Sequence, residues 1–390
     1  MKKILGLLLV PVLSWAQANT EIHLFDITSE NGQLKVINGK NISNNEGYDS
    51  QPHFYNDNVV LFASTRNGQT DIGNYNVRDN KLSYINNTPQ GGEYSPQKIP
   101  NSKNVSAVRL DKDGKQRFYE YNFKSGKDKE IIENLVVAYP MWYDKNIVVC
   151  SAIVNDSLQL FVSDIKKKTN TFITKEVGRS FHKIPNSNLV SFMKKNGDNW
   201  EVWSLHPITK ETKFITSTGK VQDICWLPNG SILIPDKNVI YQFNPSKDKN
   251  WSLFHRFSDE NINNISRITV NSIATKLAIT AEVSPRHLAE EQLQAYNKRD
   301  IEAFLKPYAK DVKVYTFPNQ LNYEGIDEMR KRYAPFFEKT PDLHCKIVSR
   351  IVRGNKVIDE ELVTVNGNSF NAVAIYEIID GKISSVYFLR

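Results

Sequence analysis

The pentapeptide Lys98-Ile99-Pro100-Asn101-Ser102 returns 85 residues later as Lys183-Ile184-Pro185-Asn186-Ser187, and Leu227-Pro228-Asn229-Gly230 follows after a further 43 residues. A spacing of 85 is two periods of about 43, so the chain contains an internal repeat. Further copies stand at residues 54–58 and 142–146, with a degenerate one at residues 270–272. The sequence therefore contains six copies of one unit.

Each copy continues with a short apolar run, a tight turn and an aromatic-rich run, as in residues 59–63, Asn67-Gly68 and residues 72–77. Asn-Gly tolerates the positive φ that two-residue hairpins require, so these runs are predicted to be antiparallel strands. A second turn and a final strand complete the unit. Four strands in about 43 residues is the size of one β-propeller blade.

The sixth copy is incomplete, because only two strands fit between residues 264 and 283. The missing pair is predicted at the other end, where residues 21–27 and 34–37 match the third and fourth strands of other blades. We therefore predict a six-bladed propeller over residues 19–283, closed by two strands from each end. Its pattern resembles the TolB-type propeller, and that resemblance implies architecture rather than chemistry. The G-x-S-x-G motif of a propeller-linked hydrolase does not occur.

The period stops at Ser284-Pro285-Arg286, and residues 288–305 change to helical spacing. A strand at 311–317, a helix at 325–337 and four strand-like runs follow. These runs are residues 343–352, 356–365, 371–379 and 383–389. The chain is thus predicted to be multidomain: an all-β propeller followed, at residues 284–390, by an α+β cone with three helices on a curved antiparallel sheet.

The segments Gln294-Ala295-Tyr296-Asn297-Lys298-Arg299-Asp300, Pro341-Asp342-Leu343-His344 and Ala374-Ile375-Tyr376-Glu377 resemble the SnoaL-like branch of the nuclear transport factor 2-like superfamily. That superfamily contains isomerases, cyclases and many non-catalytic binding or dimerisation modules, so the fold alone does not define a reaction. By the resemblance, the ketosteroid-isomerase base falls on Thr316 and its tyrosine on Gln292. Neither residue can perform that chemistry, which argues against an isomerase of that type.

The chain begins with Met1-Lys2-Lys3, an apolar run at 4–13 and Ala16-Gln17-Ala18. This pattern predicts a signal peptide at residues 1–18 and a mature protein that is periplasmic or secreted. The alternative is a buried N-terminal strand or short helix. A lipid anchor would need a cysteine at the cleavage point, but the first is Cys150. No later run approaches the roughly 18 residues of a membrane span, so no transmembrane segment is predicted.

Loss of Lys2 and Lys3 with the leader lowers the formal net charge from +7 to +5, and the basic residues are scattered. No nucleic-acid partner is therefore predicted.

Cys150, Cys225 and Cys345 lie in apolar runs and are interpreted as buried hydrophobic residues, with a Cys150–Cys225 bridge as the alternative. The histidines lack metal-ligand spacing, so neither a metal nor a cofactor is predicted.

In the cone, strand alternation places His344 near Asp359 or Glu361, and such a pair could act as acid and base across neighbouring strands. The alternative is cross-strand charge pairs on a solvated face. Tyr315 and Tyr376 are the candidate ligand-binding residues of the cone.

In the propeller, the residues that begin each innermost strand converge on the channel mouth. They are Gln51, Tyr94, Tyr139, His182, Asp223 and Arg267, with Glu93, Arg179 and Phe181 adjacent. Aromatic rings with a few opposite charges suit a peptide or a glycan, and a ring of repeats also suits a protein partner. The alternative is that they are ordinary loop residues.

These observations favour an exported binding or interaction protein, with the propeller as a platform for a protein, peptide or glycan. The cone would add a homodimer contact or a pocket for a small hydrophobic ligand. One alternative is an enzyme that uses the cone cavity for an isomerase-like or hydrolytic step. A further alternative is an enzyme acting at the propeller channel.

Overall fold

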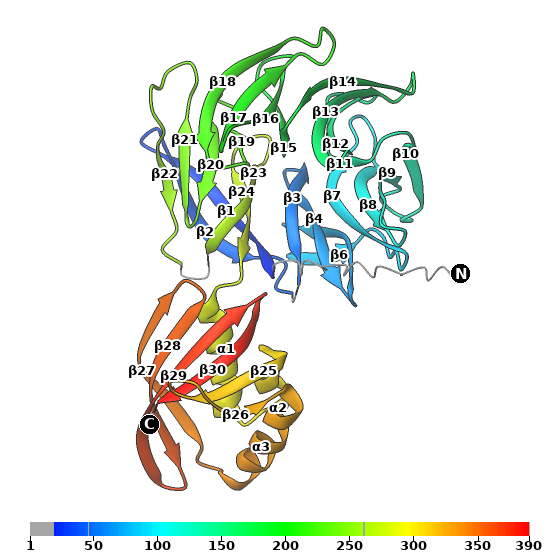
Figure 1. Cartoon of the computed structure of the whole chain (residues 1–390). Helices are drawn as coiled ribbons and strands as arrows, with labels where there is room; N and C mark the ends of the chain where they lie inside the picture. Colours follow the sequence, from blue (N-terminus) through cyan, green and yellow to red (C-terminus); the bar gives the residue numbers. More distant parts are fainter. Residues whose placement is uncertain (1–18, 46, 260–261, 390) are drawn as a thin grey trace, which may run out of the picture.

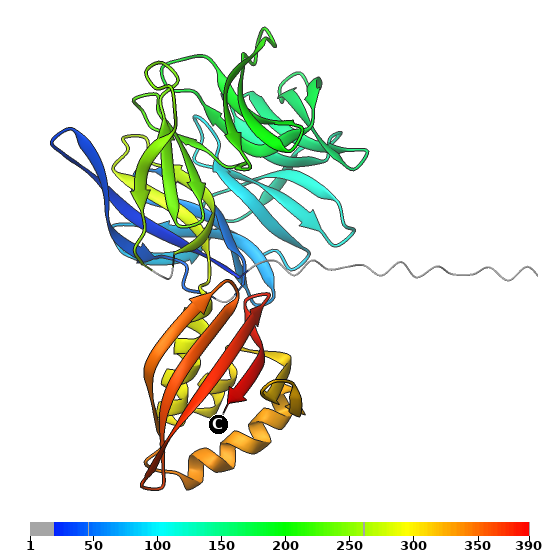
Figure 2. The same cartoon turned by 60° about the vertical axis from the view of Figure 1, so that its left-hand side comes forward.

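The computed structural model describes residues 19–45, 47–259 and 262–389. The predicted leader, residues 1–18, lies outside the described residues. Figure 1 shows a ring of sheets from the blue to the yellow part of the chain, with a smaller helix-and-sheet unit below it. The view in Figure 2 shows the same two parts, joined where the yellow strand leads into the first helix.

Six four-stranded antiparallel sheets form the ring, which confirms the predicted six-bladed propeller. Five of them are built from consecutive strands. The first two are β3 (Asp49–Asn56), β4 (Val59–Arg66), β5 (Gln69–Asn76) and β6 (Lys81–Tyr84), then β7 (Gly91–Lys98), β8 (Val105–Asp111), β9 (Gln116–Tyr121) and β10 (Asp128–Ile132). The next two are β11 (Val137–Trp142), β12 (Ile147–Val154), β13 (Ser157–Asp164) and β14 (Thr169–Lys175), then β15 (Val177–Lys183), β16 (Val190–Asn196), β17 (Asn199–Leu205) and β18 (Thr212–Gly219). The fifth is β19 (Cys225–Trp226), β20 (Ile232–Asp236), β21 (Val239–Phe243) and β22 (Ser252–Arg256).

The sixth sheet combines strands from both ends of the ring, in the order β2-β1-β24-β23. Its strands are β1 (Thr20–Glu30), β2 (Gln33–Asn41), β23 (Asn263–Val270) and β24 (Lys276–Glu282). β1 pairs with β24 from Thr20 opposite Glu282 to Asp26 opposite Lys276. This pairing satisfies the backbone groups that β1 and β24 would otherwise each present as an open edge.

The repeated sequence also produces repeated contacts between neighbouring blades. The Trp142 indole donates a hydrogen bond of 2.8 Å to Ser106 Oγ, and the Trp226 indole donates one of 2.9 Å to Ser191 Oγ. Each tryptophan is the last residue of an innermost strand: Trp142 begins one copy of the repeat motif and Trp226 directly precedes another. Each ring therefore fills the gap between two blades while its N–H finds a partner there. At the hairpin tips, Asn67 and Gly68 have φ of 50° and 77°, as the turn motif predicted.

The cone consists of three helices on a six-stranded sheet of order β26-β25-β30-β29-β28-β27. Its elements are α1 (Pro285–Lys298), α2 (Ile301–Leu305), β25 (Tyr308–Thr316), β26 (Gln320–Glu324), α3 (Ile326–Lys339), β27 (His344–Arg353), β28 (Lys356–Val365), β29 (Asn368–Ile379) and β30 (Lys382–Leu389). The Asp300 side chain accepts a hydrogen bond from Ala303 N and caps α2. The predicted α+β architecture is confirmed.

Two features of this sheet differ from the sequence-based expectation. β25 and β30 are parallel, so the sheet is not wholly antiparallel. The short strand β26 was not predicted, because it has only five residues, most of them exposed, and Leu321 and Tyr323 are its only apolar positions. β26 extends the sheet beside β25 and helps to wall the cavity described below.

Cys150, Cys225 and Cys345 are buried and unpaired, so the alternative Cys150–Cys225 bridge does not form. Burial raises the pKa of the Cys150 thiol to about 12, and the side chain behaves as a small hydrophobic residue. None of the helices in the described part of the chain has the length and apolar character needed to span a membrane.

Substitution of a closure residue should destabilise the propeller. Ile22 of β1 is fully buried and packs in a cluster with Val60 and Phe62, so Ile22→Ala should lower the free energy of unfolding by about 2–4 kcal/mol. Urea unfolding followed by tryptophan fluorescence measures this, because the cone contains no tryptophan. Ile37→Ala is the control on β2, where the side chain is 40% exposed, and should cost about 0.5 kcal/mol or less. Equal losses would contradict the proposed role of closure.

Candidate functional site

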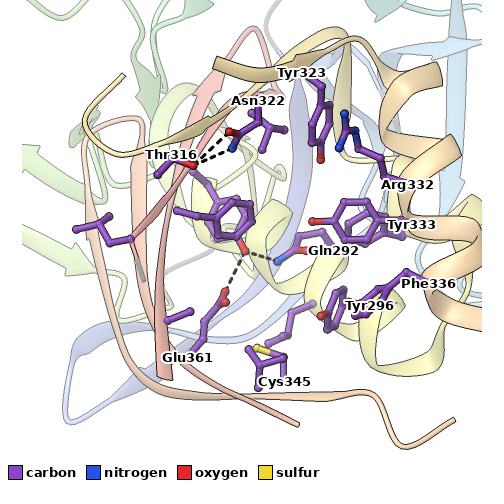
Figure 3. A pocket seen from close by; sticks show the side chains of 18 of the residues that line it. Gln292, Tyr296, Thr316, Asn322, Tyr323, Arg332, Tyr333, Phe336, Cys345 and Glu361 are labelled. Atoms are coloured by element: carbon purple, nitrogen blue, oxygen red, sulfur yellow. Dashed lines mark hydrogen bonds between the residues drawn. The ribbon is translucent and has the colours of Figure 1, made fainter. Parts of the chain in front are cut away.

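A cavity of about 1010 Å³ opens between the sheet and the helices of the cone. α1 and α3 contribute side chains on one side, and β25, β27, β28 and β29 contribute them on the other, as Figure 3 shows. The volume is at the upper end of the range typical of small-molecule sites. The residues that line this cavity, which we call the cone cavity, divide into an aromatic wall, a buried polar chain and a polar mouth.

The aromatic wall comes from the helices. Tyr333 and Phe336 of α3 are three residues apart and project from the same side of the helix, and Figure 3 shows both pointing into the cavity. The Phe304 and Tyr333 ring centroids are 4.7 Å apart, and those of Tyr296 and Tyr333 are 6.4 Å apart in an edge arrangement. Rings packed against one another in this way form a rigid apolar surface for a planar ligand.

A one-directional chain of hydrogen bonds crosses the inner wall. Tyr308 Oη donates to Gln292 Oε1 at 3.3 Å, and Gln292 Nε2 donates to Tyr376 Oη at 2.9 Å. Tyr376 Oη in turn donates to Glu361 Oε1 at 3.1 Å. All four residues are buried and line the cavity, and the chain ends on the only ionisable carboxyl of that lining.

The surroundings of the Glu361 carboxyl favour its neutral, protonated form. Burial raises the pKa of Glu361 to about 7, with a further increase from the charge of Asp359, while the Tyr376 hydrogen bond and Arg350 act in the opposite direction. At neutral pH the group can therefore donate or accept a proton. A ligand carbonyl, hydroxyl or amine that reaches this end of the cavity would find a hydrogen-bonding partner in either state.

The mouth of the cavity is polar. Thr316 Oγ1 and the Asn322 amide lie within hydrogen-bonding distance, at 3.1 Å from Nδ2 and 3.2 Å from Oδ1. The Arg332 guanidinium lies 4.5 Å from the centroid of the Tyr323 ring, and Figure 3 shows the two side by side. These groups give the entrance a hydrogen-bonding rim around an apolar interior.

The structure does not bring His344 together with either carboxylate, so the acid–base pair expected from strand alternation does not form. His344 lies opposite Thr364 and is exposed, whereas Glu361 lies opposite Ile347 on the inner face. An irregularity between Ile347 and Ser349 shifts the register. Three positions separate His344 from Ile347, so His344 faces the side of the sheet opposite to Glu361, and the irregularity reverses the alternation only for later residues such as Arg350.

The same irregularity turns Arg350 inward. Its guanidinium binds both oxygens of Asp359, with Nε–Oδ1 at 2.6 Å and Nη2–Oδ2 at 2.7 Å, and reaches Glu290 Oε2 of α1 at 2.8 Å. Asp359 is fully buried and the Arg350 side chain is 6% exposed. Asp359 is thus part of a structural cross-strand ion pair, which lies on the inner face rather than on a solvated one.

Tyr315 lies outside the cone cavity, because its ring stacks on Tyr387 with centroids 4.8 Å apart. Thr316 and Gln292, at the positions taken from the isomerase comparison, do line the cavity, as does Tyr376. Tyr296, Tyr333 and Phe336 were not among the predicted site residues. Helical spacing places Tyr333 and Phe336 on one face of α3, but spacing does not distinguish a cavity wall from a filled core.

A second cavity, of about 420 Å³, is the central channel of the propeller, and side chains from all six blades line it. Five of the six predicted rim residues are among them: Gln51, Tyr139, His182, Asp223 and Arg267. The sixth, Tyr94, packs against Tyr48 with ring centroids 6.0 Å apart. Arg179 and Phe181 also line the channel, while Glu93 is fully buried and accepts a hydrogen bond from Tyr121 Oη at 2.8 Å.

Irregular strand pairing sets the direction of several of these channel-lining side chains. Register shifts occur in β3 between Ser50 and His53, in β7 between Tyr94 and Gln97, and in β15 between Val177 and Phe181. Gln51 and Ser95, which lie within these shifts, have positive φ. Gln51 Oε1 accepts a hydrogen bond of 2.6 Å from Ser95 N, which joins two neighbouring blades. Bulges of this kind re-aim side chains at the ends of strands.

Burial lowers the pKa of both His53 and His182 to about 4. The two histidines are therefore neutral at pH 7, and lysine, arginine and aspartate side chains set the charge of the channel lining. His182 Nε2 lies 3.0 Å from Ser180 Oγ.

The fold and the two cavities define a six-bladed propeller carrying a cone-shaped pocket domain. Residues 289–386 match the model of the SnoaL-like domain family. No curated protein matches the chain. A TolB from Agrobacterium tumefaciens is 12% identical, with 68% of this chain and 99% of that chain covered and a TM-score of 0.53. At that identity the match shows a common propeller fold.

Two solved structures match the cone. A cystatin-fold protein from Novosphingobium aromaticivorans is 25% identical, covers 28% of this chain and 99% of its own, and gives a TM-score of 0.27. An NTF2-like protein from Cytophaga hutchinsonii is 18% identical, covers 28% of this chain and 91% of its own, and gives a TM-score of 0.25.

The titration of Glu361 should be visible near neutral pH. The folded pKa lies above the reference value of 4.5, so stability falls by up to about 3 kcal/mol as pH rises from about 4.5 to about 7 and changes no further above that. Carboxyl ¹³C shifts measured from pH 4 to 9 should contain a resonance with a midpoint near 7 that Glu361→Gln removes. Glu360→Gln, which changes an exposed neighbour on the opposite face, should leave that resonance in place. A midpoint below 5 for Glu361 would contradict this account of the site.

Proposed function

We propose that this protein is an exported binding protein in which the cone cavity takes a small, mainly apolar molecule and the propeller channel receives a partner. One observation carries the proposal: a cavity of about 1010 Å³ whose aromatic wall faces a buried carboxyl at the end of a hydrogen-bonded chain. Apolar area supplies affinity in such a cavity, and a few fixed polar groups orient the ligand. The expected ligand is planar, with one hydrogen-bonding group directed at Glu361.

Export, the domain boundaries and dimerisation are parts of the same proposal. The leader-like pattern at residues 1–18 supports a periplasmic or secreted location. The end of β24 at Glu282 and the start of α1 at Pro285 support units at residues 19–283 and 284–390. Val348 and Ile351 of the edge strand β27 are 55% and 59% exposed, which supports a homodimer contact through the cone.

Filling the cone cavity should abolish binding of an apolar probe. Ala372 lies beside Glu361 in the sheet and lines the cavity, whereas its neighbour Asn371 is exposed on the other face. Ala372→Phe should weaken the binding of Nile red, a neutral dye that fluoresces in apolar surroundings, by at least tenfold. Asn371→Phe adds the same ring outside the cavity and should change affinity less than twofold. Equal affinity in both variants would refute binding in the cone cavity.

The protonation of Glu361 favours a second candidate function, an enzyme that moves a proton on a small ligand. A carboxyl that titrates near pH 7 inside a partly apolar site meets the requirement for a general acid or base. Tyr376 positions that carboxyl through its 3.1 Å hydrogen bond. The absence of a carboxylate at Thr316 leaves Glu361 as the group of the cavity lining able to act in this way.

This second function is tested by proton exchange at carbon. Acetophenone incubated with the protein in deuterated buffer should lose its methyl protons faster than in buffer alone, as measured by ¹H NMR. Glu361→Gln should reduce the enzymatic rate by about a hundredfold or more, and Glu360→Gln should not. Absence of exchange above the buffer rate, or exchange unaffected by Glu361→Gln, would eliminate this acid–base role.

A further inference from the structure

The charges that line the propeller channel are unequal. Four cationic side chains, those of Lys98, Arg179, Lys183 and Arg267, line it, and Asp223 is the one carboxylate among the lining residues. The two histidines of the lining are neutral at pH 7, as described above. The channel lining therefore carries a net positive charge that its own residues do not balance.

The imbalance is sharpest where two arginines share one carboxylate. Arg267 Nη1 lies 2.8 Å from Asp223 Oδ1 and 3.0 Å from Oδ2, while Arg179 Nε donates to Oδ2 at 2.8 Å. The Arg267 side chain is 12% exposed and that of Asp223 is 9% exposed, so solvent screens this pair weakly, while Arg179 is 32% exposed and more accessible. Burying a cation without an equal opposite charge is costly, and an incoming anion would remove that cost.

Asp223 also fixes the position of both guanidinium groups. A fourth blade joins the cluster, because Arg267 lies 5.8 Å from the centroid of the Tyr139 ring. Guanidinium groups held in place before a ligand arrives lose little side-chain entropy on binding, and their planar donors match the geometry of a carboxylate or phosphate. The arrangement has the properties of a preorganised oxyanion site.

The remaining two cations occupy a second level of the channel. Lys183 follows Arg179 by four residues on β15, a rise of at most about 13 Å. Lys98 is at the corresponding repeat position on β7. The lining also includes Pro96, Pro140 and Met141, which offer apolar contact. Two cationic levels separated by about four extended residues match a short chain that carries several negative charges.

We propose that the propeller channel is an oxyanion-binding site that takes the carboxylates of an extended acidic peptide. This inference rests on the proposed use of the propeller as a binding platform and is independent of the cone cavity. It adds to that proposal the chemical class of the partner and the residues that recognise it, with Arg179 and Arg267 at one level and Lys98 and Lys183 at the other.

The test uses the full chain and two blocked tetrapeptides, acetyl-tetraglutamate amide and acetyl-tetralysine amide, titrated by calorimetry. The glutamate peptide should bind, more weakly as sodium chloride is raised, and the lysine peptide should not. Arg179→Met should weaken binding of the glutamate peptide by tenfold or more. Arg256→Met removes the same charge from an exposed position on the outer strand β22 and should change affinity less than twofold.

Lys183→Met provides an independent variant, because Lys183 is exposed and its replacement does not threaten folding. It should weaken the glutamate peptide at least threefold. Equal binding of both peptides, no binding of either, or the same loss in Arg179→Met and Arg256→Met would overturn the inference. Binding of both peptides that is lost in Tyr139→Ala would overturn oxyanion recognition while leaving the platform proposal intact.

Titration with inorganic phosphate and with acetate separates the sources of the oxyanion. Each should compete with the glutamate peptide only at concentrations at least tenfold higher than the peptide itself. Phosphate that binds as tightly as the peptide would overturn the assignment of an acidic peptide and would identify a free ion as the ligand.

Discussion

The antiparallel pairing of β1 with β24 is the constraint on which the rest of the structure depends. It joins residues about 250 positions apart in the chain and is anchored at one end by the ion pair of Lys276 with Asp26. Without this pairing, β24 and β1 would each present a row of unpaired backbone groups. β23, which carries Arg267 into the channel, would also lie in a two-stranded sheet of marginal stability. The geometry of the channel therefore depends on the closure of the ring.

Closure also positions the cone. β24 ends at Glu282 and α1 begins at Pro285, so two residues separate the last propeller strand from the first helix of the cone. Val283 N donates to Asn19 O at 3.0 Å, which ties the start of the described chain to this junction. A connection this short, held by a backbone hydrogen bond, restricts the rotation of one unit against the other. β24, which pairs with β1 to close the ring, is thus also the strand to which the cone is directly connected.

The sequence predicted the elements of the fold better than it predicted the chemistry of either site. Repeat period, turn residues and strand alternation are local properties, and they were sufficient to predict six blades and to place five rim residues in the channel. The His344 pairing was wrong because it depended on the register between β27 and β28: His344 lies opposite Thr364, three positions from the Ile347–Glu361 pair, and so faces the other side of the sheet. Glu361 was identified as a candidate, but its environment is made by Tyr376 and Gln292 from other elements. No local pattern reveals that environment.

The two sites respond differently to pH for physical reasons that the structure makes explicit. The channel's positive charge comes from arginine and lysine, which stay protonated across the physiological range, and its histidines, with pKa near 4, do not add to it. The cone cavity instead ends at a carboxyl whose pKa is about 7 because burial disfavours its charged form. Between pH 6 and 8 the cone cavity therefore changes from a neutral to an anionic interior while the channel lining keeps its charge. A change of pH in this range would therefore alter the charge of the cone cavity and leave the charge of the channel lining unchanged.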